Sequence, residues 1–372
     1  MSKRKRLVFS LIALLLPLAA AVMAYLGYAA YRTRTLYFYV KNNQVGWAGN
    51  VHLADAELGL APLPDGEGEM VFPIGENIPV RYDDQGFRAP VDGDYTAATR
   101  PHLLFLGGSF TYGASVRAED SYPYLVGDAL GGYAMNAGVP SYGLAQMLLR
   151  ARELIPAYKP DYVIVQYSPW LVERAVSPFA PTYIGKLPTP YFYDSEEGLA
   201  LERPVFRTKV FDLPVDGFRT KTINAPDFAR FVWNVGLPLF AHDDTQMAIY
   251  NLKKGLGLLP NPTKDYEAVV EMVYAEIGAL ARQNGAQMVI VILGGDHRPV
   301  EAPLGLFPPE ALVVDAHAAL LAQLGVSSEA AYFEQFGIWR GEPPELVDRH
   351  PNESAHRVIA GEIIAAILGI EE

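Results

Sequence analysis

A serine, a histidine and an aspartate in this sequence have the residue types and local settings that nucleophilic catalysis needs. Ser109 follows the apolar run Leu103–Leu106 and two glycines, Gly107 and Gly108. This pattern predicts a buried strand that runs into a tight turn, with a hydroxyl held at the carboxyl edge of a sheet. Ligands bind at that edge in open α/β sheets. Ser109 is therefore the candidate nucleophile.

Two commoner motifs do not fit this turn. A nucleophile elbow of the α/β-hydrolase kind needs a glycine two residues either side of the serine, and Thr111 occupies the second of these places. A phosphate-binding P-loop needs Gly-Lys-Ser/Thr, and the turn contains no lysine. A plain β-turn is the alternative interpretation, because Gly-Gly-Ser is common in turns.

The base that a nucleophilic serine needs is offered by the segment Asp348–Asn352. Pro351 forces His350 into an extended conformation, and residues two apart in extended backbone project to the same side. The Asp348 carboxylate can therefore orient the His350 ring. In such an arrangement the histidine accepts the proton of Ser109 and the aspartate stabilises the imidazolium, so that the hydroxyl can attack an acyl carbon.

An oxyanion formed in this reaction needs hydrogen-bond donors at the same sheet edge. We expect the main-chain N–H groups of Ser109 and Gly138 to supply them, because each follows a predicted strand. Three more side chains are expected to line the substrate site: Trp170, Tyr112 and His297. Trp170 is either a platform for a sugar or a lid on the core, and the alternative for His297 is a surface turn.

Other polar residues have simpler interpretations. Arg88 could clamp an anion, but such an arginine more often fixes a loop. The run His242-Asp243-Asp244 could bind a cation, yet no second cluster has metal-ligand spacing, and a solvated turn is favoured. His356 is expected on a helix surface. No metal and no cofactor is predicted.

The elements that must position the candidate residues alternate between strand and helix from about residue 100, which implies right-handed parallel crossovers. The expected strands are 103–106, 133–136, 161–167 and 287–293, and the expected helices are 120–130, 144–157, 265–284, 309–324 and 353–368. Residues 177–263 interrupt this rhythm with dense prolines and aromatic residues. We interpret them as an insertion that forms a substrate cap over the strand ends, its second part rich in turns.

The first hundred residues divide into three parts. Residues 1–6 form a basic tail, and residues 7–31 are apolar enough to cross a membrane as a helix. The positive-inside bias places the amino terminus in the cytoplasm and the remainder outside, anchored in the cytoplasmic membrane by a single pass. A signal peptide cleaved near Ala24 is the alternative. Residues 32–99 read as a β-rich arm with short strands at 37–40, 70–72 and 78–82.

Composition narrows the class of protein. The 372 residues carry a formal net charge of -12, and four of the basic residues lie in the first six positions. So acidic a chain argues against nucleic acid as a partner, because phosphate neutralisation needs a basic face. The absence of cysteine excludes disulfides, thiolate catalysis, cysteine-ligated metals and a lipoprotein anchor.

Four blocks, taken together and in order, resemble the SGNH (GDSL-type) hydrolase superfamily. They are residues 107–113 around the serine, the glycine block 136–143, Pro160-Asp161 before the third strand, and residues 348–352. The resemblance covers about residues 80–172 and 265–370. It implies a three-layer α/β/α sandwich with a flavodoxin-like parallel sheet, within a domain of residues 100–372. It also implies esterase, lipase, carbohydrate deacetylase or O-acetyltransferase activity, most like exported members that handle acyl groups on envelope glycans.

One departure from the family pattern affects the oxyanion site. The family usually has Gly-x-Asn-Asp after the third strand, and this chain has Ser168-Pro169-Trp170-Leu171. Loss of one oxyanion donor typically costs about 100-fold to 1000-fold in turnover. The candidate substitutes are Asn136, Gln166, Ser168 and the indole of Trp170.

The sequence therefore predicts a membrane-anchored serine esterase or O-acyltransferase that forms an acyl-enzyme on an acylated carbohydrate or other ester. Hydrolysis and transfer share this intermediate and differ in whether water or a sugar hydroxyl arrives second. A non-catalytic envelope protein that holds a glycan or a partner is the rival hypothesis, and Trp170 in place of asparagine supports it. A structural assembly protein, with the insertion as its interface, is the third.

Overall fold

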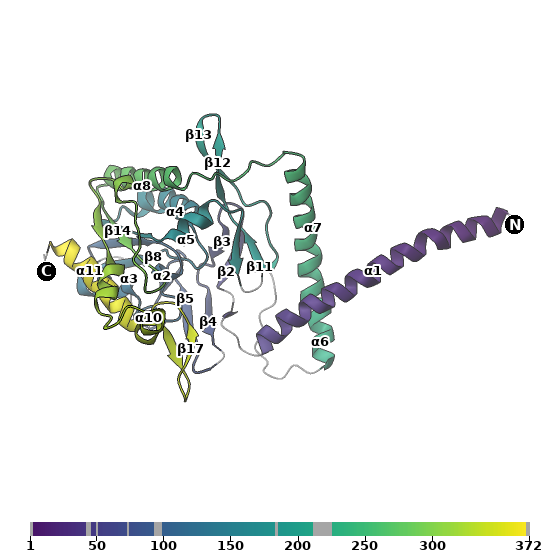
Figure 1. Cartoon of the computed structure of the whole chain (residues 1–372), viewed down its shortest axis with the longest axis horizontal. Helices are drawn as coiled ribbons and strands as arrows, with labels where there is room; N and C mark the ends of the chain where they lie inside the picture. The colour runs from purple at the N-terminus through teal and green to yellow at the C-terminus, as the bar shows by residue number, and fades with distance from the viewer. Residues whose placement is uncertain are drawn as a thin grey trace.

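A mixed β-sheet runs through the centre of the computed structural model, which describes residues 3–41, 46–49, 51–72, 74–92, 99–182, 185–210 and 225–369 (Figure 1). Among these residues, nine strands pair in the order β1-β4-β5-β6-β8-β7-β9-β14-β15. Their bounds are, in sheet order, Gly46–Gly49, Glu67–Val71, Ile78–Tyr82, Arg88–Ala89, Tyr133–Asn136, His102–Leu106, Tyr162–Tyr167, Gln287–Ile292 and Leu312–Val314.

The half of the sheet that carries the candidate nucleophile is parallel. Strands β8, β7, β9, β14 and β15 pair in parallel, and their order by position in the chain is 2-1-3-4-5. This is the flavodoxin-like order, in which ligands bind at the carboxyl ends of the strands where the order reverses. Strands β7, β9 and β14 are buried over nearly their whole length, as expected of parallel strands with both faces covered.

Helices cover both faces of this parallel half. One face packs against α4 (Leu144–Tyr158), α5 (Pro169–Ala175) and α8 (Tyr266–Gln283). The other packs against α3 (Tyr122–Ala129), α9 (Ala316–Ala322), α10 (Glu329–Phe336) and α11 (Glu353–Leu368). The predicted α/β class with a three-layer arrangement is therefore confirmed.

Residues between the N-terminal helix and β7 extend the sheet on its antiparallel side. Strands β1, β4, β5 and β6 pair antiparallel with one another, and β6 joins them to β8 through Arg88 and Asn136. A separate hairpin is formed by β2 (His52–Asp55) and β3 (Gly59–Pro62). This segment therefore shares one sheet with the strands around the candidate site.

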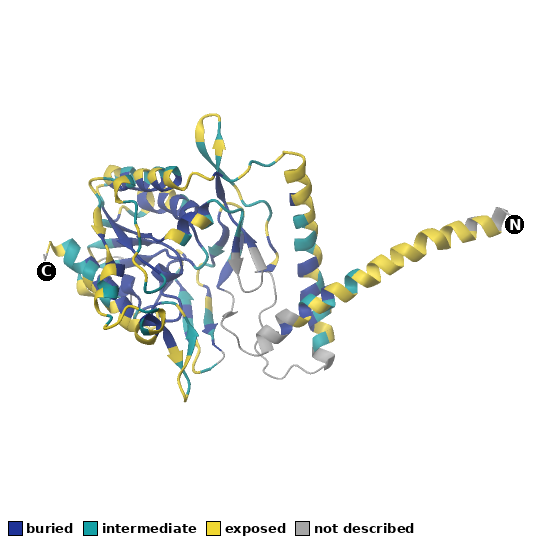
Figure 2. Ribbon diagram, viewed as in Figure 1, coloured by how far each residue is buried: buried dark blue, intermediate teal, exposed yellow. Residues whose placement is uncertain are grey.

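The N-terminal helix α1 (Lys3–Lys41) is longer than the apolar run that predicted it. The strand expected at residues 37–40 is wrong, because the helix continues through them. Tyr37 packs edge-on against the rings of Phe228 and Phe231, at centroid distances of 4.9 and 5.7 Å. This tertiary packing outweighs the strand propensity of aromatic residues. Figure 2 shows that the part of α1 that projects from the body is exposed.

The insertion consists of two hairpins followed by a helical segment. The hairpins are β10–β11 (Phe179–Thr182 and Gly185–Pro188) and β12–β13 (Tyr191–Ser195 and Gly198–Glu202). Then come α6 (Ala225–Phe231), a π-helical turn (Val232–Gly236) and α7 (Leu237–Gly255). The expectation of a turn-rich second part is thus wrong. Its buried side chains share one apolar cluster with Tyr37 of α1 and with Val139 and Tyr142 of the glycine block.

The C-terminal third differs from its prediction at one element. The expected helix over residues 309–324 is instead strand β15 followed by the short helix α9, whose N-cap is Asp315. Beyond α10, strands β16 (Ile338–Arg340) and β17 (Glu345–Asp348) form a hairpin that leads into α11. Asn352 caps α11 by accepting a 3.0 Å hydrogen bond from the N–H of Ala355.

Candidate active site

Ser109 is the first residue of the short helix α2 (Ser109–Tyr112), which begins two residues after β7 ends. Its exposed fraction is 8%. The turn between β7 and Ser109 requires glycine at position 107, because a Cβ atom there would lie 1.9 Å from the Thr111 hydroxyl oxygen and 2.6 Å from Oε1 of Gln166. The sequence pattern of strand, glycines and serine therefore places the hydroxyl at the carboxyl edge of the sheet.

Gln166 and Ser168 hold this turn from the neighbouring strand end. Oε1 of Gln166 accepts hydrogen bonds from the Gly108 N–H at 3.0 Å and from the Thr111 hydroxyl at 2.8 Å. Its amide nitrogen donates to Ser168 at 2.9 Å, and the Ser168 hydroxyl donates to the carbonyl of Leu293 at 2.7 Å. Both side chains are fully buried. They are therefore engaged in supporting the nucleophile turn instead of pointing donors at a substrate.

Asn136 supports the same turn from the other side. Its amide nitrogen donates to the carbonyl of Thr111 at 3.1 Å, and its Oδ1 accepts from the N–H of Gly138 at 3.1 Å. A Cβ atom on Gly138 would lie 2.5 Å from the main-chain nitrogen of Tyr112, so the close approach requires glycine. The N–H expected to meet the oxyanion is thus paired with Asn136 in this structure.

Tyr112 and Arg88 belong to the core beneath the turn. Tyr112 is fully buried, which corrects the expectation that it lines the substrate site. The Arg88 guanidinium lies 4.2 Å from the Tyr112 ring and donates to the main-chain carbonyls of Tyr112, Gly113 and Val116. Arg88 is also fully buried, so it has the loop-fixing role and not that of an anion clamp.

The histidine pair forms as the sequence predicts. Nδ1 of His350 lies 2.9 and 3.0 Å from the two carboxylate oxygens of Asp348. The carboxylate also accepts from the Ser115 hydroxyl and, at 2.7 Å, from the N–H of Arg349. Burial raises the pKa of Asp348, but the hydrogen bonds and the charge of His350 outweigh it, and the net pKa is lowered. The carboxylate therefore stays ionised and holds the ring through Nδ1.

Phe110 brings the two parts of the site together. Its ring centroid lies 5.6 Å from that of His350, edge to face, and 5.1 Å from that of Trp170. Because Phe110 directly follows Ser109, the histidine loop reaches the nucleophile turn. Within the described part of the chain, the His350 ring hydrogen-bonds to Asp348 and makes no hydrogen bond to Ser109. Nε2 is the ring atom left for the serine, and such bonds often tighten only when substrate is bound.

Trp170 and His297 lie at neighbouring strand ends. Trp170 is half-buried at the start of α5, where the indole packs on Phe110 and lies 3.4 Å from the position of a Cβ on Gly295. His297 is half-buried after β14, and its Nδ1 atom has no hydrogen-bond partner in the described part of the chain. His356, expected on a helix surface, is fully buried, and its Nδ1 accepts a 3.2 Å hydrogen bond from the N–H of Tyr122.

Arg174 is a residue of the site that the sequence analysis missed. Its Nη1 donates to the carbonyl of Tyr142 at 3.0 Å and lies 3.6 Å from the position that a Cβ on Gly108 would take. Within the described residues it has no carboxylate partner at ion-pair distance, and burial lowers its pKa. The signal available in the sequence was its place one helical turn after Trp170, on the helix that follows the third parallel strand.

The run His242-Asp243-Asp244 lies in helix α7 and not in a solvated turn, and its side chains pair with other groups of the protein. His242 and Asp243 pair at 2.8 Å, Asp243 accepts from the Thr208 hydroxyl, and Asp244 pairs with Arg32 of α1. Among the described residues, no group of three or more potential metal ligands is found.

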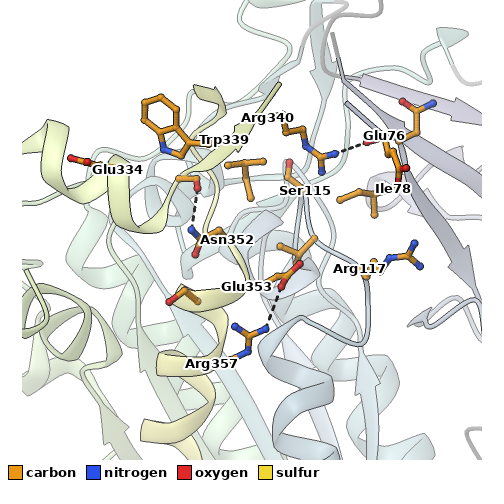
Figure 3. A pocket seen from close by; sticks show the side chains of 15 residues that line it. Glu76, Ile78, Ser115, Arg117, Glu334, Trp339, Arg340, Asn352, Glu353 and Arg357 are labelled. Atoms are coloured by element: carbon orange, nitrogen blue, oxygen red, sulfur yellow. Dashed lines mark hydrogen bonds and ion pairs between the residues drawn. The ribbon is translucent and has the colours of Figure 1, made fainter. Parts of the chain in front are cut away.

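A cavity of about 600 Å³ lies between the β16–β17 hairpin, the start of α11 and the segment around Ser115 (Figure 3). Ser115, whose hydroxyl donates to the Asp348 carboxylate, is one of its lining residues. Charged side chains from several elements surround it, among them Glu76, Arg117, Arg340 and Arg357. The three arginines have partners in the protein: Arg340 donates to the Glu76 carbonyl at 2.5 Å, Arg357 pairs with Glu353 at 3.2 Å, and Arg117 pairs with Glu119 at 3.7 Å.

Comparison with solved structures finds proteins of the class that the sequence blocks resemble. The chain is similar to a GDSL-like lipase from Bacteroides thetaiotaomicron, with 12% identity over 73% of this chain and 89% of that one, at a TM-score of 0.35. It is also similar to a catalytic mutant of an acetylxylan esterase from Geobacillus stearothermophilus, with 15% identity over 74% and 98% of the two chains and a TM-score of 0.34. An α/β hydrolase enzyme from the metagenome of Lake Arreo, Spain, has 15% identity over 75% and 100%, at a TM-score of 0.37. No protein-family model and no curated protein matches the sequence.

Proposed function

We propose that this chain is a serine esterase or O-acyltransferase that acts through an acyl-enzyme on Ser109. The observation that carries the proposal is the meeting of the Asp348–His350 pair with the nucleophile turn through Phe110. A hydroxyl at a sheet edge, an imidazole that packs on the residue after it and a carboxylate on the Nδ1 side of that imidazole are the parts that acyl transfer needs.

The proposed reaction has two halves. His350 Nε2 takes the proton of Ser109 as the hydroxyl oxygen attacks the acyl carbon, and it then returns the proton to the departing alcohol, which leaves the acyl group on the serine. In the second half Nε2 takes a proton from water or from a second alcohol, whose oxygen attacks the acyl carbon, and returns that proton to Ser109. Asp348 holds the ring tautomer throughout.

We propose that Arg174 stabilises the oxyanion together with the N–H of Ser109. The Gly138, Asn136, Gln166 and Ser168 groups are already paired within the protein. Arg174 lies against Gly108 and has no carboxylate partner among the described residues. A partly desolvated guanidinium at this place would supply the positive charge that the family's asparagine dipole otherwise provides.

The substrate that we propose is an acetylated carbohydrate outside the cytoplasm, and the support is the resemblance of the sequence blocks to exported SGNH proteins together with the N-terminal helix. Its segment Val8–Arg34 is long and apolar enough to cross a membrane. The basic tail favours a cytoplasmic amino terminus. We propose an uncleaved anchor, because the apolar run continues past the alternative cleavage site near Ala24. Residues after that site, among them Arg32 and Tyr37, pack onto the insertion. Residues 100–372 would then form the catalytic domain, with residues 177–263 as its cap.

A fluorophosphonate probe tests the nucleophile. We expect the full chain to be labelled and Ser109→Ala to lose the label. Ser195→Ala, in the β12–β13 hairpin, is the matched control and should be labelled like the wild type. Equal labelling of wild type and Ser109→Ala would exclude Ser109 as the nucleophile.

A non-catalytic glycan-binding protein is the second candidate. The observation that favours it is the internal pairing of the Gly138 N–H with Asn136, combined with Trp170 at the place of the family's asparagine. This candidate predicts binding of an acetylated glycan without ester cleavage or acyl transfer, and with the same affinity in Ser109→Ala.

A further inference from the structure

Helix α7 of the insertion exposes a row of large apolar side chains. Ile249 and Leu252 have exposed fractions of 41% and 63%, and Leu256, just beyond the helix, has 64%. Positions three, four and seven apart share one side of a helix. The opposite side carries the buried Leu239 and Tyr250. A contiguous exposed apolar row of this kind marks an interaction surface.

The position of this row is fixed relative to α1. Arg32 pairs with Asp244 of α7 at 2.5 Å, and its guanidinium lies 4.1 Å from the centroid of the Phe240 ring. A Cβ atom on Gly236, the last residue of the π-helical turn before α7, would lie 1.9 Å from the hydroxyl oxygen of Thr33, so the Thr33 side chain packs directly against the glycine backbone. The hydroxyl of Tyr25 also reaches Asp244, at 3.5 Å. Residues 25–33 of α1 are therefore the crossing point.

The apolar part of α1 before this crossing has the length of a bilayer. Residues 7–24 number about 18, which at about 1.5 Å per residue span about 27 Å, close to the thickness of a hydrocarbon core. Tyr25, Tyr28 and Tyr31 follow directly, at the place where interfacial aromatic residues lie. The outer membrane–water interface thus falls where α1 crosses α7.

Figure 1 shows α7 at the edge of the folded body from which α1 projects. The C-terminal end of α7 carries Lys253 and Lys254, which suit anionic lipid headgroups. Trp233, in the π-helical turn that contacts α1, has an exposed fraction of 70%. Apolar, basic and indole groups together are the composition of a helix that lies in a membrane interface.

From this arrangement we propose that the exposed apolar row at the C-terminal end of α7, formed by Ile249 and Leu252 of the helix and by Leu256 and Leu258 just beyond it, lies in the outer surface of the bilayer that α1 spans. The inference rests on the proposed anchoring by α1. It adds a second membrane contact, supplied by the substrate cap itself.

Single cysteines test the proposal in the full chain, because the natural sequence contains none. Leu252→Cys, Leu15→Cys and Val326→Cys each receive a nitroxide label, and the proteins are reconstituted in phosphatidylethanolamine/phosphatidylglycerol vesicles. Val326 is the matched control. Its exposed fraction of 70% is similar to the 63% of Leu252, and it lies on the loop before α10. The ratio of label accessibility to oxygen over that to a nickel chelate reports depth in the membrane.

We expect this ratio to be about fivefold higher or more at positions 252 and 15 than at position 326, as for groups in lipid. A label at 15 in lipid with the label at 252 as accessible to nickel as that at 326 would overturn the inference and leave the anchor intact. Labels at both 15 and 252 in water would overturn the anchor and the inference together. Because Leu252 is exposed, we expect its label to leave the packing unchanged. A circular-dichroism melting curve equal to that of the wild type will show that the labelled chain is folded.

Discussion

The nucleophile turn and the histidine loop are built in contrasting ways. The turn around Ser109 is buried, and side chains from three separate strands fix it: Gln166 from β9, Asn136 from β8 and Arg88 from β6. The loop with Asp348 and His350 follows a two-stranded hairpin, and the His350 side chain is 31% exposed. The candidate nucleophile is therefore fixed by side chains of the central sheet, while the candidate base follows a separate two-stranded hairpin.

This difference indicates that the histidine loop, and not the nucleophile turn, is the part of the candidate site that can move. The turn is held by several hydrogen bonds from neighbouring strands, whereas the His350 ring is held through Nδ1 by a single carboxylate. Under the proposed mechanism, substrate binding therefore completes the Ser109–His350 hydrogen bond through movement of the histidine loop.

The largest effect should follow from removing either reacting group. We expect Ser109→Ala and His350→Ala each to lower kcat for 4-nitrophenyl acetate by about 10⁴-fold or more, and the double variant to be no slower, because the two residues act as a unit. Initial-rate kinetics measure this. Arg349→Ala is the control, since that exposed side chain pairs only with Glu329 among carboxylates in the described structure. Additive losses in the double variant would show that the two regions do not cooperate.

Variants of Arg174 test whether this side chain, beside the buried nucleophile turn, supplies the positive charge that stabilises the oxyanion. Arg174→Gln should lower kcat by about 100-fold to 1000-fold with little change in KM, because the charge acts mainly in the transition state. Arg174→Lys should recover part of the loss, and Glu173→Gln, an exposed neighbour, should have no effect. A rise in KM alone would assign Arg174 to substrate binding.

His356, six residues after His350, sharpens the comparison through its effect on stability at low pH. Burial, with the nearby charges of Arg88 and His350, lowers the pKa of His356 from 6.5 to about 3. Between these two values the unfolded chain binds a proton that the folded chain does not, so the free energy of unfolding falls as pH falls through this window. Each pKa unit corresponds to about 1.4 kcal/mol. In His356→Asn, which keeps an acceptor for the Tyr122 N–H, chemical denaturation should show a flatter pH dependence than in wild type.

The smallest effect should come from the hydroxyl that supports Asp348. Ser115→Ala removes one of several hydrogen bonds to that carboxylate, and we expect kcat to fall by less than about tenfold, with the free energy of unfolding lowered by about 1 kcal/mol. Gln166→Leu, beneath the turn, should lower the free energy of unfolding by about 2 kcal/mol or more, because it leaves the Gly108 N–H buried without a partner and removes one of the two hydrogen bonds of the Thr111 hydroxyl. Equal losses of stability in thermal melts would contradict the contrast between turn and loop.

Local patterns predicted the elements that position the site, because their physical causes are local. The apolar runs of β7, β9 and β14 and the alternation of Asp348 with His350 are readable in the sequence. The pairing of the Gly138 N–H with Asn136 and the place of Arg174 beside Gly108 depend on how separate elements meet. Strand β15 was missed because it has three residues, two of them exposed.

The continuity of α1 has a consequence for the anchored state proposed above. Helix α1 is uninterrupted from Lys3 to Lys41, and its Arg32 pairs with Asp244 of the insertion. In that state the folded body is held at a nearly constant distance from the bilayer. An esterase held in this way would reach only esters at that distance and would meet new ones by lateral diffusion.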